Sequence, residues 1–209
     1  MQSRNSKNRV LAYICLVCFS ILPMYVSAKT IMIVGDSLSA GYGVQVEQGW
    51  VNLLKKRLEQ QYPKKHKVVN ASVSGETTSG ALARLPKLLT THKPNIVVIE
   101  LGGNDGLRGQ PPQLIQKNLA QLVNLSQKSN AKVILFGMKI PPNYGSAYQQ
   151  AFENSYKVVS NQYKIKLMPF FLKDVAGNKS LMQKDQIHPN AKAQPILLNN
   201  AYPYIKGAL

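Results

Sequence analysis

The feature that most constrains the fold is an alternation of short apolar segments with segments of helical periodicity. Five apolar segments have the length and residue types of buried strands, and they cover residues 30–34, 67–70, 95–101, 131–136 and 167–171. Between them, leucine, isoleucine and valine recur at the spacing of amphipathic helices. This alternation predicts an α/β domain with a parallel sheet and helices on both faces.

The beginning of the chain does not follow this pattern. Three basic residues among the first nine precede a 13-residue apolar segment, residues 10–22, which Pro23 ends. This is the layout of a cleavable secretory signal peptide, since a membrane-spanning helix needs about 20 apolar residues. We therefore expect a leader at residues 1–28, one domain at residues 29–209, and a periplasmic or secreted location.

Cysteine and charge constrain the mature chain. Both cysteines, Cys15 and Cys18, lie in the predicted leader, so the domain is expected to be held by its own core without disulfides. The leader also carries three of the 26 basic residues and none of the nine acidic ones, which leaves a net charge of 23 − 9 = +14. The basic residues are scattered and no aromatic residues interleave with them. We interpret them as solvated side chains with a weak attraction to anionic lipid, and not as a nucleic-acid platform.

Small or polar residues follow four of the five predicted strands. Ser37, Gly75 and Asn104 follow the first three, and the pair Asp185 and His188 follows the fifth. Taken alone, each has an ordinary explanation as a helix cap, a turn or a surface residue. In an open parallel sheet, however, the loops after the strands share one edge, so these residues are expected to converge.

The converging residues have the chemistry of a serine hydrolase. Ser37 is the candidate nucleophile, which needs a base and a group that orients the base. His188 is the candidate base because an unperturbed imidazole titrates near pH 6.5, and Asp185 is close enough in sequence to orient it. The backbone N–H groups of Ser37 and Gly75 and the side-chain amide of Asn104 are candidate donors to an oxyanion.

An acyl tail would need an apolar wall beside these groups. The segments after the third and fourth predicted strands offer Leu107, Ile140, Pro142 and Tyr144. Ordinary loop packing is the alternative explanation for these four side chains. We name them as the candidate substrate-binding residues.

Four segments resemble the sequence blocks of the SGNH (GDSL) hydrolase family. They are Gly35–Ser39, Gly75, Gly102–Asp105 and Asp185–His188. The resemblance covers essentially the whole predicted mature chain, and it is closest to bacterial periplasmic members that act on thioesters and lysophospholipids. It implies a flavodoxin-like three-layer α/β/α sandwich with a five-stranded parallel sheet.

The resemblance also implies residue roles and an activity. Ser37 would be the nucleophile, His188 the base and Asp185 the orienting acid, with Ser37, Gly75 and Asn104 forming the oxyanion hole. Acyl esters, thioesters, lysophospholipids and aryl esters would be hydrolysed without a cofactor or metal. We expect a monomer with small-molecule substrates and no nucleic-acid partner.

Two other functions stay open at this point. A carbohydrate O-acetyl esterase would use the same catalytic residues and differ in the depth and apolarity of its pocket. A basic envelope-binding protein without catalysis would bind anionic polymers and leave Ser37 unreactive toward a phosphonate. Nucleotide and metal sites are not expected, because the turn between Gly35 and Gly43 fits neither glycine-rich phosphate-binding pattern and clustered metal ligands are missing.

Overall fold

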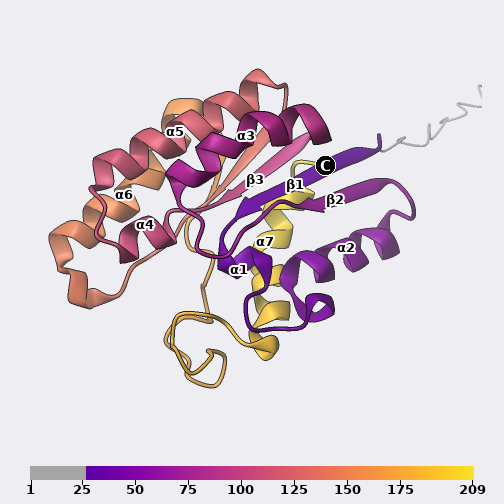
Figure 1. Ribbon diagram of the computed structural model, residues 1–209. Helices are drawn as coiled ribbons and strands as arrows, with labels where there is room; N and C mark the ends of the chain where they lie inside the picture. Colours follow the sequence, from indigo (N-terminus) through magenta and orange to yellow (C-terminus); the bar gives the residue numbers. More distant parts are fainter. Residues whose placement is uncertain (1–26) are drawn as a thin grey trace, which may run out of the picture.

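A wholly parallel five-stranded sheet organises the computed structural model, which describes residues 27–209 (Figure 1). Apart from Ser27 and Ala28, the predicted leader lies outside the described residues. The strand order is β2-β1-β3-β4-β5, which confirms the predicted fold class. The strands are β1 (Lys29–Gly35), β2 (His66–Asn70), β3 (Ile96–Glu100), β4 (Lys132–Phe136) and β5 (Lys166–Met168).

Helices cover both faces of this sheet (Figure 1). One layer contains α3 (Thr78–His92), α5 (Pro112–Lys128) and α6 (Ser146–Tyr163), and the other contains α2 (Trp50–Gln61) and α7 (Gln194–Lys206). Short helical turns occupy the loops: α1 (Ser37–Ala40), η1 (Val46–Gln48), α4 (Gly103–Leu107), η2 (Pro142–Tyr144) and η3 (Ala191–Ala193). No helix from residue 27 onward is both long and apolar enough to span a membrane.

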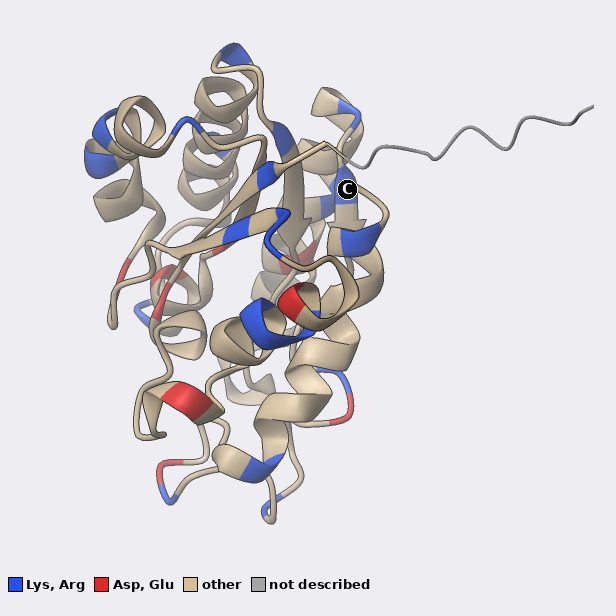
Figure 2. Cartoon of the chain, turned by 90° about the vertical axis from the view of Figure 1, so that its right-hand side faces the viewer, with Lys and Arg blue, Asp and Glu red and all other residues tan. Residues whose placement is uncertain are grey.

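The parallel strands give the molecule two functionally different edges. All strands begin at one edge, the amino edge, which faces the viewer in Figure 2. All strands end at the opposite edge, which we call the catalytic edge. The chain order reverses between β1 and β3, and ligands bind open α/β sheets at such a switch point on the carboxyl side of the strands.

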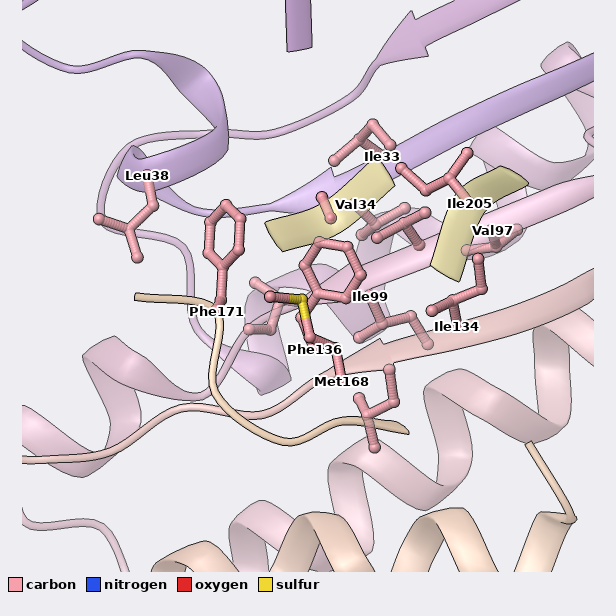
Figure 3. Close-up of a cluster of buried hydrophobic side chains, with 14 of the residues drawn as sticks. Ile33, Val34, Leu38, Val97, Ile99, Ile134, Phe136, Met168, Phe171 and Ile205 are labelled. Atoms are coloured by element: carbon pink, nitrogen blue, oxygen red, sulfur yellow. The ribbon is translucent and has the colours of Figure 1, made fainter. Parts of the chain in front are cut away.

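The core lies between the sheet and its helices. β3 is buried along its whole length, and Ile31 to Gly35 of β1 are buried as well, which explains their continuous apolar runs. Phe136 and Phe171 pack together beside the sheet (Figure 3), and Trp50 joins them, with ring centroids 5.2–6.1 Å apart. Aromatic pairs at such distances stabilise a core by about 0.5–1.5 kcal/mol beyond their burial.

The fifth strand is shorter than the sequence predicts. β5 ends at Met168 because Pro169 follows, and proline has no N–H to donate to a strand partner. Phe170 and Phe171, which the pattern placed in the strand, therefore begin the loop. Phe171 enters the core, whereas Phe170 lines a cavity at the catalytic edge.

Candidate active site

Three side chains from two distant loops meet at the catalytic edge. Ser37 is the first residue of α1 and directly follows the turn that ends β1. Its Oγ lies 2.9 Å from Nε2 of His188, and Nδ1 of that ring lies 2.7 Å from Oδ2 of Asp185. The structure thus brings together the three residues that the sequence proposed as nucleophile, base and orienting acid.

A tight turn holds Asp185 at the Nδ1 edge of the imidazole. Its Oδ1 accepts the backbone N–H groups of Ile187 and His188 at 2.9 and 3.0 Å. The His188 N–H, helped by the His188 ring and the Ile187 N–H, lowers the pKa of Asp185 to about 2. Asp185 is therefore a carboxylate in neutral solution, and it accepts a hydrogen bond from the Nδ1–H of His188. Because Nδ1 carries the ring proton, Nε2 is free to accept a hydrogen bond from the Ser37 hydroxyl.

The Tyr42 ring packs against the His188 ring. Its ring centroid lies 4.5 Å from that of His188, and its carbonyl accepts a hydrogen bond from Gln183 at 2.7 Å. The Gln183 N–H in turn donates to the His188 carbonyl. Sequence reasoning missed Tyr42, because nothing in the pattern places the loop after α1 against a loop more than 140 residues away.

The buried Asp36 and the partly buried Asn104 form a hydrogen-bonded pair beside the nucleophile. Asp36 caps α1, with Oδ1 accepting the Leu38 N–H at 3.0 Å, while Oδ2 accepts Nδ2 of Asn104 at 3.1 Å. The Asp36 residue is 2% exposed, and this burial raises the pKa of its carboxyl to about 6, against the lowering by the Leu38 N–H. Both oxygens accept hydrogen bonds, which favours the ionised form.

The second amide hydrogen of Asn104 also has an acceptor. Nδ2 donates to the Glu76 carbonyl at 3.0 Å, so both amide hydrogens of this candidate oxyanion donor have acceptors within the protein. Gly75 precedes Glu76 in the same loop and has φ of 78°, a conformation that glycine favours. Arg108 donates to the Gly75 carbonyl at 3.2 Å and ties this loop to the end of α4.

A largely apolar cavity of about 520 Å³ opens beside Ser37. Three of the four side chains that the sequence proposed for the acyl wall, Leu107, Ile140 and Pro142, line it. Tyr144, the fourth, is not among its lining residues, and its hydroxyl instead donates to the Leu107 carbonyl at 2.7 Å. The remaining apolar wall includes Met138, Phe170, Leu172, Met182 and Ile187.

Known proteins share this architecture. The family model described as GDSL-like Lipase/Acylhydrolase matches residues 33–195. The chain belongs to this family. It is thus a serine hydrolase of the esterase type, as the sequence indicated.

Relatives cover nearly the whole chain of this GDSL hydrolase. Esterase TesA of Pseudomonas aeruginosa is 50% identical over 190 residues, which are 90% of this chain and 94% of TesA. The thioesterase 1/protease 1/lysophospholipase L1 of Escherichia coli K12 is 43% identical over 171 residues, 82% of this chain and 80% of its own. An arylesterase of Vibrio mimicus is 40% identical over 187 residues, 90% and 92% of the two chains.

Solved structures agree with this assignment. A crystal structure of TesA superposes with a TM-score of 0.84 at 51% identity, covering 87% of this chain and all of the other. The psychrotrophic esterase EstA from Pseudoalteromonas sp., in a structure inhibited by monoethylphosphonate, superposes with a TM-score of 0.82 at 47% identity, covering 86% and 97%.

Two further buried acids of this GDSL hydrolase support its catalytic edge. Asp105 accepts the N–H and the hydroxyl of Thr78 at 2.9 and 2.6 Å, and so fastens α4 to the first turn of α3, where negative charge is favourable. Glu100 ends β3 and accepts the hydroxyl of Ser39 in α1 at 2.6 Å. Its burial, together with the nearby Asp36, raises the pKa of Glu100 well above its ordinary value.

Metal ligands are not grouped in the part of the chain that the structure describes. Among residues 27–209, no three or more His, Cys, Asp or Glu side chains are arranged to hold a metal ion.

Proposed function

We propose that the protein hydrolyses acyl esters and thioesters, including lysophospholipids and aryl esters, through an acyl-enzyme on Ser37. The observation that carries the proposal is the Ser37–His188–Asp185 chain at the mouth of an apolar cavity of about 520 Å³. The printed names of the relatives support the substrate range, since they describe an esterase, an arylesterase and a thioesterase/protease/lysophospholipase.

Acylation begins with attack of the Ser37 oxygen on the acyl carbonyl carbon. His188 Nε2, 2.9 Å from that oxygen, takes the hydroxyl proton as the new C–O bond forms. The Asp185 carboxylate holds the ring in the required tautomer and stabilises the imidazolium. His188 then returns the proton to the departing alkoxide or thiolate as the tetrahedral intermediate collapses to the acyl-enzyme.

The oxyanion of the intermediate needs donors that already point toward it. The Ser37 N–H lies at the first position of α1, where a backbone N–H has no intrahelical acceptor. One amide hydrogen of Asn104 would leave the Glu76 carbonyl and bond to the oxyanion. The other would keep its hydrogen bond to Asp36. The Gly75 N–H is the third candidate donor, because its loop reaches Asn104 through Glu76.

Deacylation repeats these steps with water in place of serine. His188 takes a proton from water, the hydroxide oxygen bonds to the acyl carbon, and Ser37 leaves with the proton that His188 returns. The acid product then leaves the cavity. Neither half-reaction needs an electron acceptor or a metal.

The cavity bears on the two alternatives from the sequence. An O-acetyl esterase has no use for a large apolar cavity, whereas Met138, Ile140, Phe170 and Leu172 line one of about 520 Å³ here. A binding protein without catalysis does not account for a histidine hydrogen-bonded to both a serine hydroxyl and a carboxylate.

The cellular setting belongs to the same proposal. The leader-like segment in residues 1–28 supports export to the periplasm or beyond, and the mature charge of +14 supports a weak attraction to anionic surfaces. We expect a monomer without a cofactor, and substrates that arrive as small molecules.

A chain-length series tests the substrate class. Rates of p-nitrophenyl esters from acetyl to long acyl chains are compared for the parent protein and for Ile140→Ser, with Ile140→Val as the conservative control. A buried methylene contributes about 0.8 kcal/mol, so the loss in kcat/KM should grow with acyl length for the serine variant and stay small for the valine variant.

A different result would place the tail elsewhere. Ile140 also packs against α4, where a Cβ added at Gly106 would come within 2.8 Å of it. Equal losses at every chain length would therefore mean that Ile140 supports α4 and the site geometry. A parent protein most active on acetylated sugars and inactive on long acyl esters would favour the O-acetyl esterase.

A further inference from the structure

Exposed lysines gather at the amino edge of the sheet, opposite the catalytic edge. The strand register places Lys67 level with Thr30 of β1 and Lys132 level with Ile96 of β3. Figure 2 faces this edge and shows blue segments along it and few red ones. We call the following exposed residues the amino-edge patch: Lys64, Lys65, Lys67, Lys93, Lys128, Lys132, Lys164, Lys166 and Lys206.

The charge of the patch is not balanced by acids. Glu59 at the end of α2 is the single acidic residue beside it, and its carboxylate accepts the Lys64 backbone N–H, not an ammonium group. The other eight of the nine acidic residues lie nearer the catalytic edge. Within residues 27–209, none of the ion pairs involves a patch lysine: they are Arg84–Glu76, Lys139–Glu153 and His188–Asp185.

Helix capping explains only part of the patch. Helices run opposite to the strands, so their C-termini lie at the amino edge, where lysines interact favourably with the helix dipole. That accounts for Lys128 and Lys206 in last turns and for Lys93 and Lys164, the C-caps of α3 and α6, but Lys67, Lys132 and Lys166 belong to strands.

Three patch lysines even occupy unfavourable backbone positions. Lys64, Lys93 and Lys164 have φ of 57°, 42° and 53°, in the left-handed region that glycine favours. Lysine at these positions supplies charge at some conformational cost. Lys93 and Lys164 recover part of this cost as C-caps, so Lys64 and the three strand lysines belong to the part of the patch that helix capping does not explain.

We infer that the amino-edge patch is a docking surface for membranes that contain anionic phospholipids. The five strands, spaced about 4.8 Å apart, make this edge about 19 Å wide, so many lysines can act together on an extended charged surface. The exposed large apolar side chains lie outside the patch: they are Tyr42, Val46, Val73, Leu114 and Ile187. Binding is therefore electrostatic and reversible, and the patch has no aromatic platform of the kind that nucleic-acid binders use.

This docking would turn the active site away from the membrane. The seven residues of β1 rise about 3.3 Å each, which puts roughly 20 Å between the patch and the mouth of the cavity. The docked enzyme would stay close to the lipid and still receive dispersed substrates from solution. This consequence rests on the ester hydrolysis and the export proposed above, whereas binding by the patch does not depend on hydrolysis.

Two matched variants, each with four fewer charges, test the inference in the protein purified after export. None of the substituted ammonium groups donates a hydrogen bond within residues 27–209. The patch variant carries Lys65→Gln, Lys67→Gln, Lys128→Gln and Lys166→Gln. The control variant carries Lys173→Gln, Lys179→Gln, Lys184→Gln and Lys192→Gln, at exposed positions on the catalytic side.

Vesicle sedimentation gives the readout, with phosphatidylcholine alone and mixed with phosphatidylglycerol. We expect the parent to partition onto the anionic vesicles and to be released by salt. A lysine near an anionic surface contributes about fivefold to binding, so the patch variant should lose binding by about 10²–10³-fold. The control variant should keep most of the binding, and all three proteins should hydrolyse p-nitrophenyl acetate at the same rate.

Several outcomes would overturn the inference. Equal loss of binding in both variants would show that binding depends on net charge and not on the patch. Equal binding to vesicles with and without phosphatidylglycerol would show that anionic phospholipid is not the partner. Tighter binding to duplex DNA than to anionic vesicles at the same salt would assign the patch to nucleic acid. Slower phosphonate labelling of Ser37 on saturating vesicles would show that the catalytic edge faces the lipid. A parent that binds the vesicles through the patch without hydrolysing esters would contradict the proposed function alone.

Discussion

The substitution Asp36→Asn tests whether a buried carboxylate holds the oxyanion donor in place. The two oxygens have separate partners, since Oδ1 accepts the Leu38 N–H and Oδ2 accepts the Asn104 amide. Asparagine keeps the shape but has one acceptor oxygen, and its NH₂ group would face a donor on the other side. One of the two hydrogen bonds is lost whichever way the new amide turns.

The expected loss of activity follows from that hydrogen bond. A hydrogen bond to a charged group contributes about 1.5–3 kcal/mol, so a misplaced Asn104 should lower kcat by roughly 10- to 150-fold with little change in KM. Protonation of Asp36 removes an acceptor in the same way. Because its pKa lies at about 6, kcat of the parent should fall as the pH drops below 6, beyond what the need for a neutral His188 imposes.

The free energy of unfolding of the parent should depend on pH in the opposite direction to kcat. The pKa of Asp36 is higher in the folded protein, about 6, than its ordinary value of 3.8, so the folded state binds more protons between these pH values. The free energy of unfolding of the parent therefore falls as the pH rises from about 4 to 6, by up to about 3 kcal/mol. Asparagine does not titrate and avoids this cost, which offsets the hydrogen bond of about 1.5–3 kcal/mol that it loses, so the Tm of the variant at pH 7 should stay close to that of the parent.

The assay combines steady-state kinetics on p-nitrophenyl butyrate with thermal unfolding between pH 4 and 8. Asp174→Asn is the charge-matched control, since Asp174 is exposed in a loop on the catalytic side. It should leave kcat unchanged. A variant Asp36→Asn with parent-like kcat, or one whose loss appears only in KM, would refute the role assigned to the Asp36–Asn104 contact.

Two more substitutions probe the surroundings of the nucleophile. Asn104→Ala should lower kcat by roughly 10²–10³-fold with a small effect on KM, because the amide acts on the developing oxyanion. An effect on KM in steady-state kinetics would show instead that Asn104 binds the substrate in its ground state. Glu100→Gln should keep its activity, since burial raises the pKa of Glu100 and favours a neutral carboxyl that an amide can replace. The free energy of unfolding of the parent falls as the pH rises through the pKa of Glu100 in the folded protein, because the buried carboxyl then ionises. Thermal unfolding at alkaline pH should therefore show that the glutamine variant is more stable than the parent.

The layered architecture was predictable because parallel strands buried on both faces leave continuous apolar runs in the sequence. Such runs do not mark strand ends reliably. Pro169 ends the fifth strand by removing a hydrogen-bond donor, although the apolar residues continue to Phe171. The strand order needs the pairing of β1 with both β2 and β3, which depends on contacts between segments far apart in the chain.

The catalytic loops could be located because topology alone brings the ends of parallel strands to one edge. The contacts around them could not. Asp36 and Asn104 are 68 residues apart, and nothing in either local pattern indicates that their side chains meet. The cavity wall was equally hidden, because Phe170 and Met182 reach it only through the folding of the long loop after β5. Tyr144 was placed on that wall from loop position, but its hydroxyl turns to the Leu107 carbonyl.

Covalent labelling of Ser37 tests the central claim most directly. The parent and a Ser37→Ala variant are treated with a fluorophosphonate, the labelled residue is identified by peptide mass spectrometry, and hydrolysis of a long-chain acyl ester is measured on the same samples. We expect one label on Ser37 with parallel loss of activity, and a folded variant that is unlabelled and slower by about 10⁴-fold or more. A folded Ser37→Ala protein with near-parental turnover, or a fully labelled parent that stays active, would contradict the mechanism.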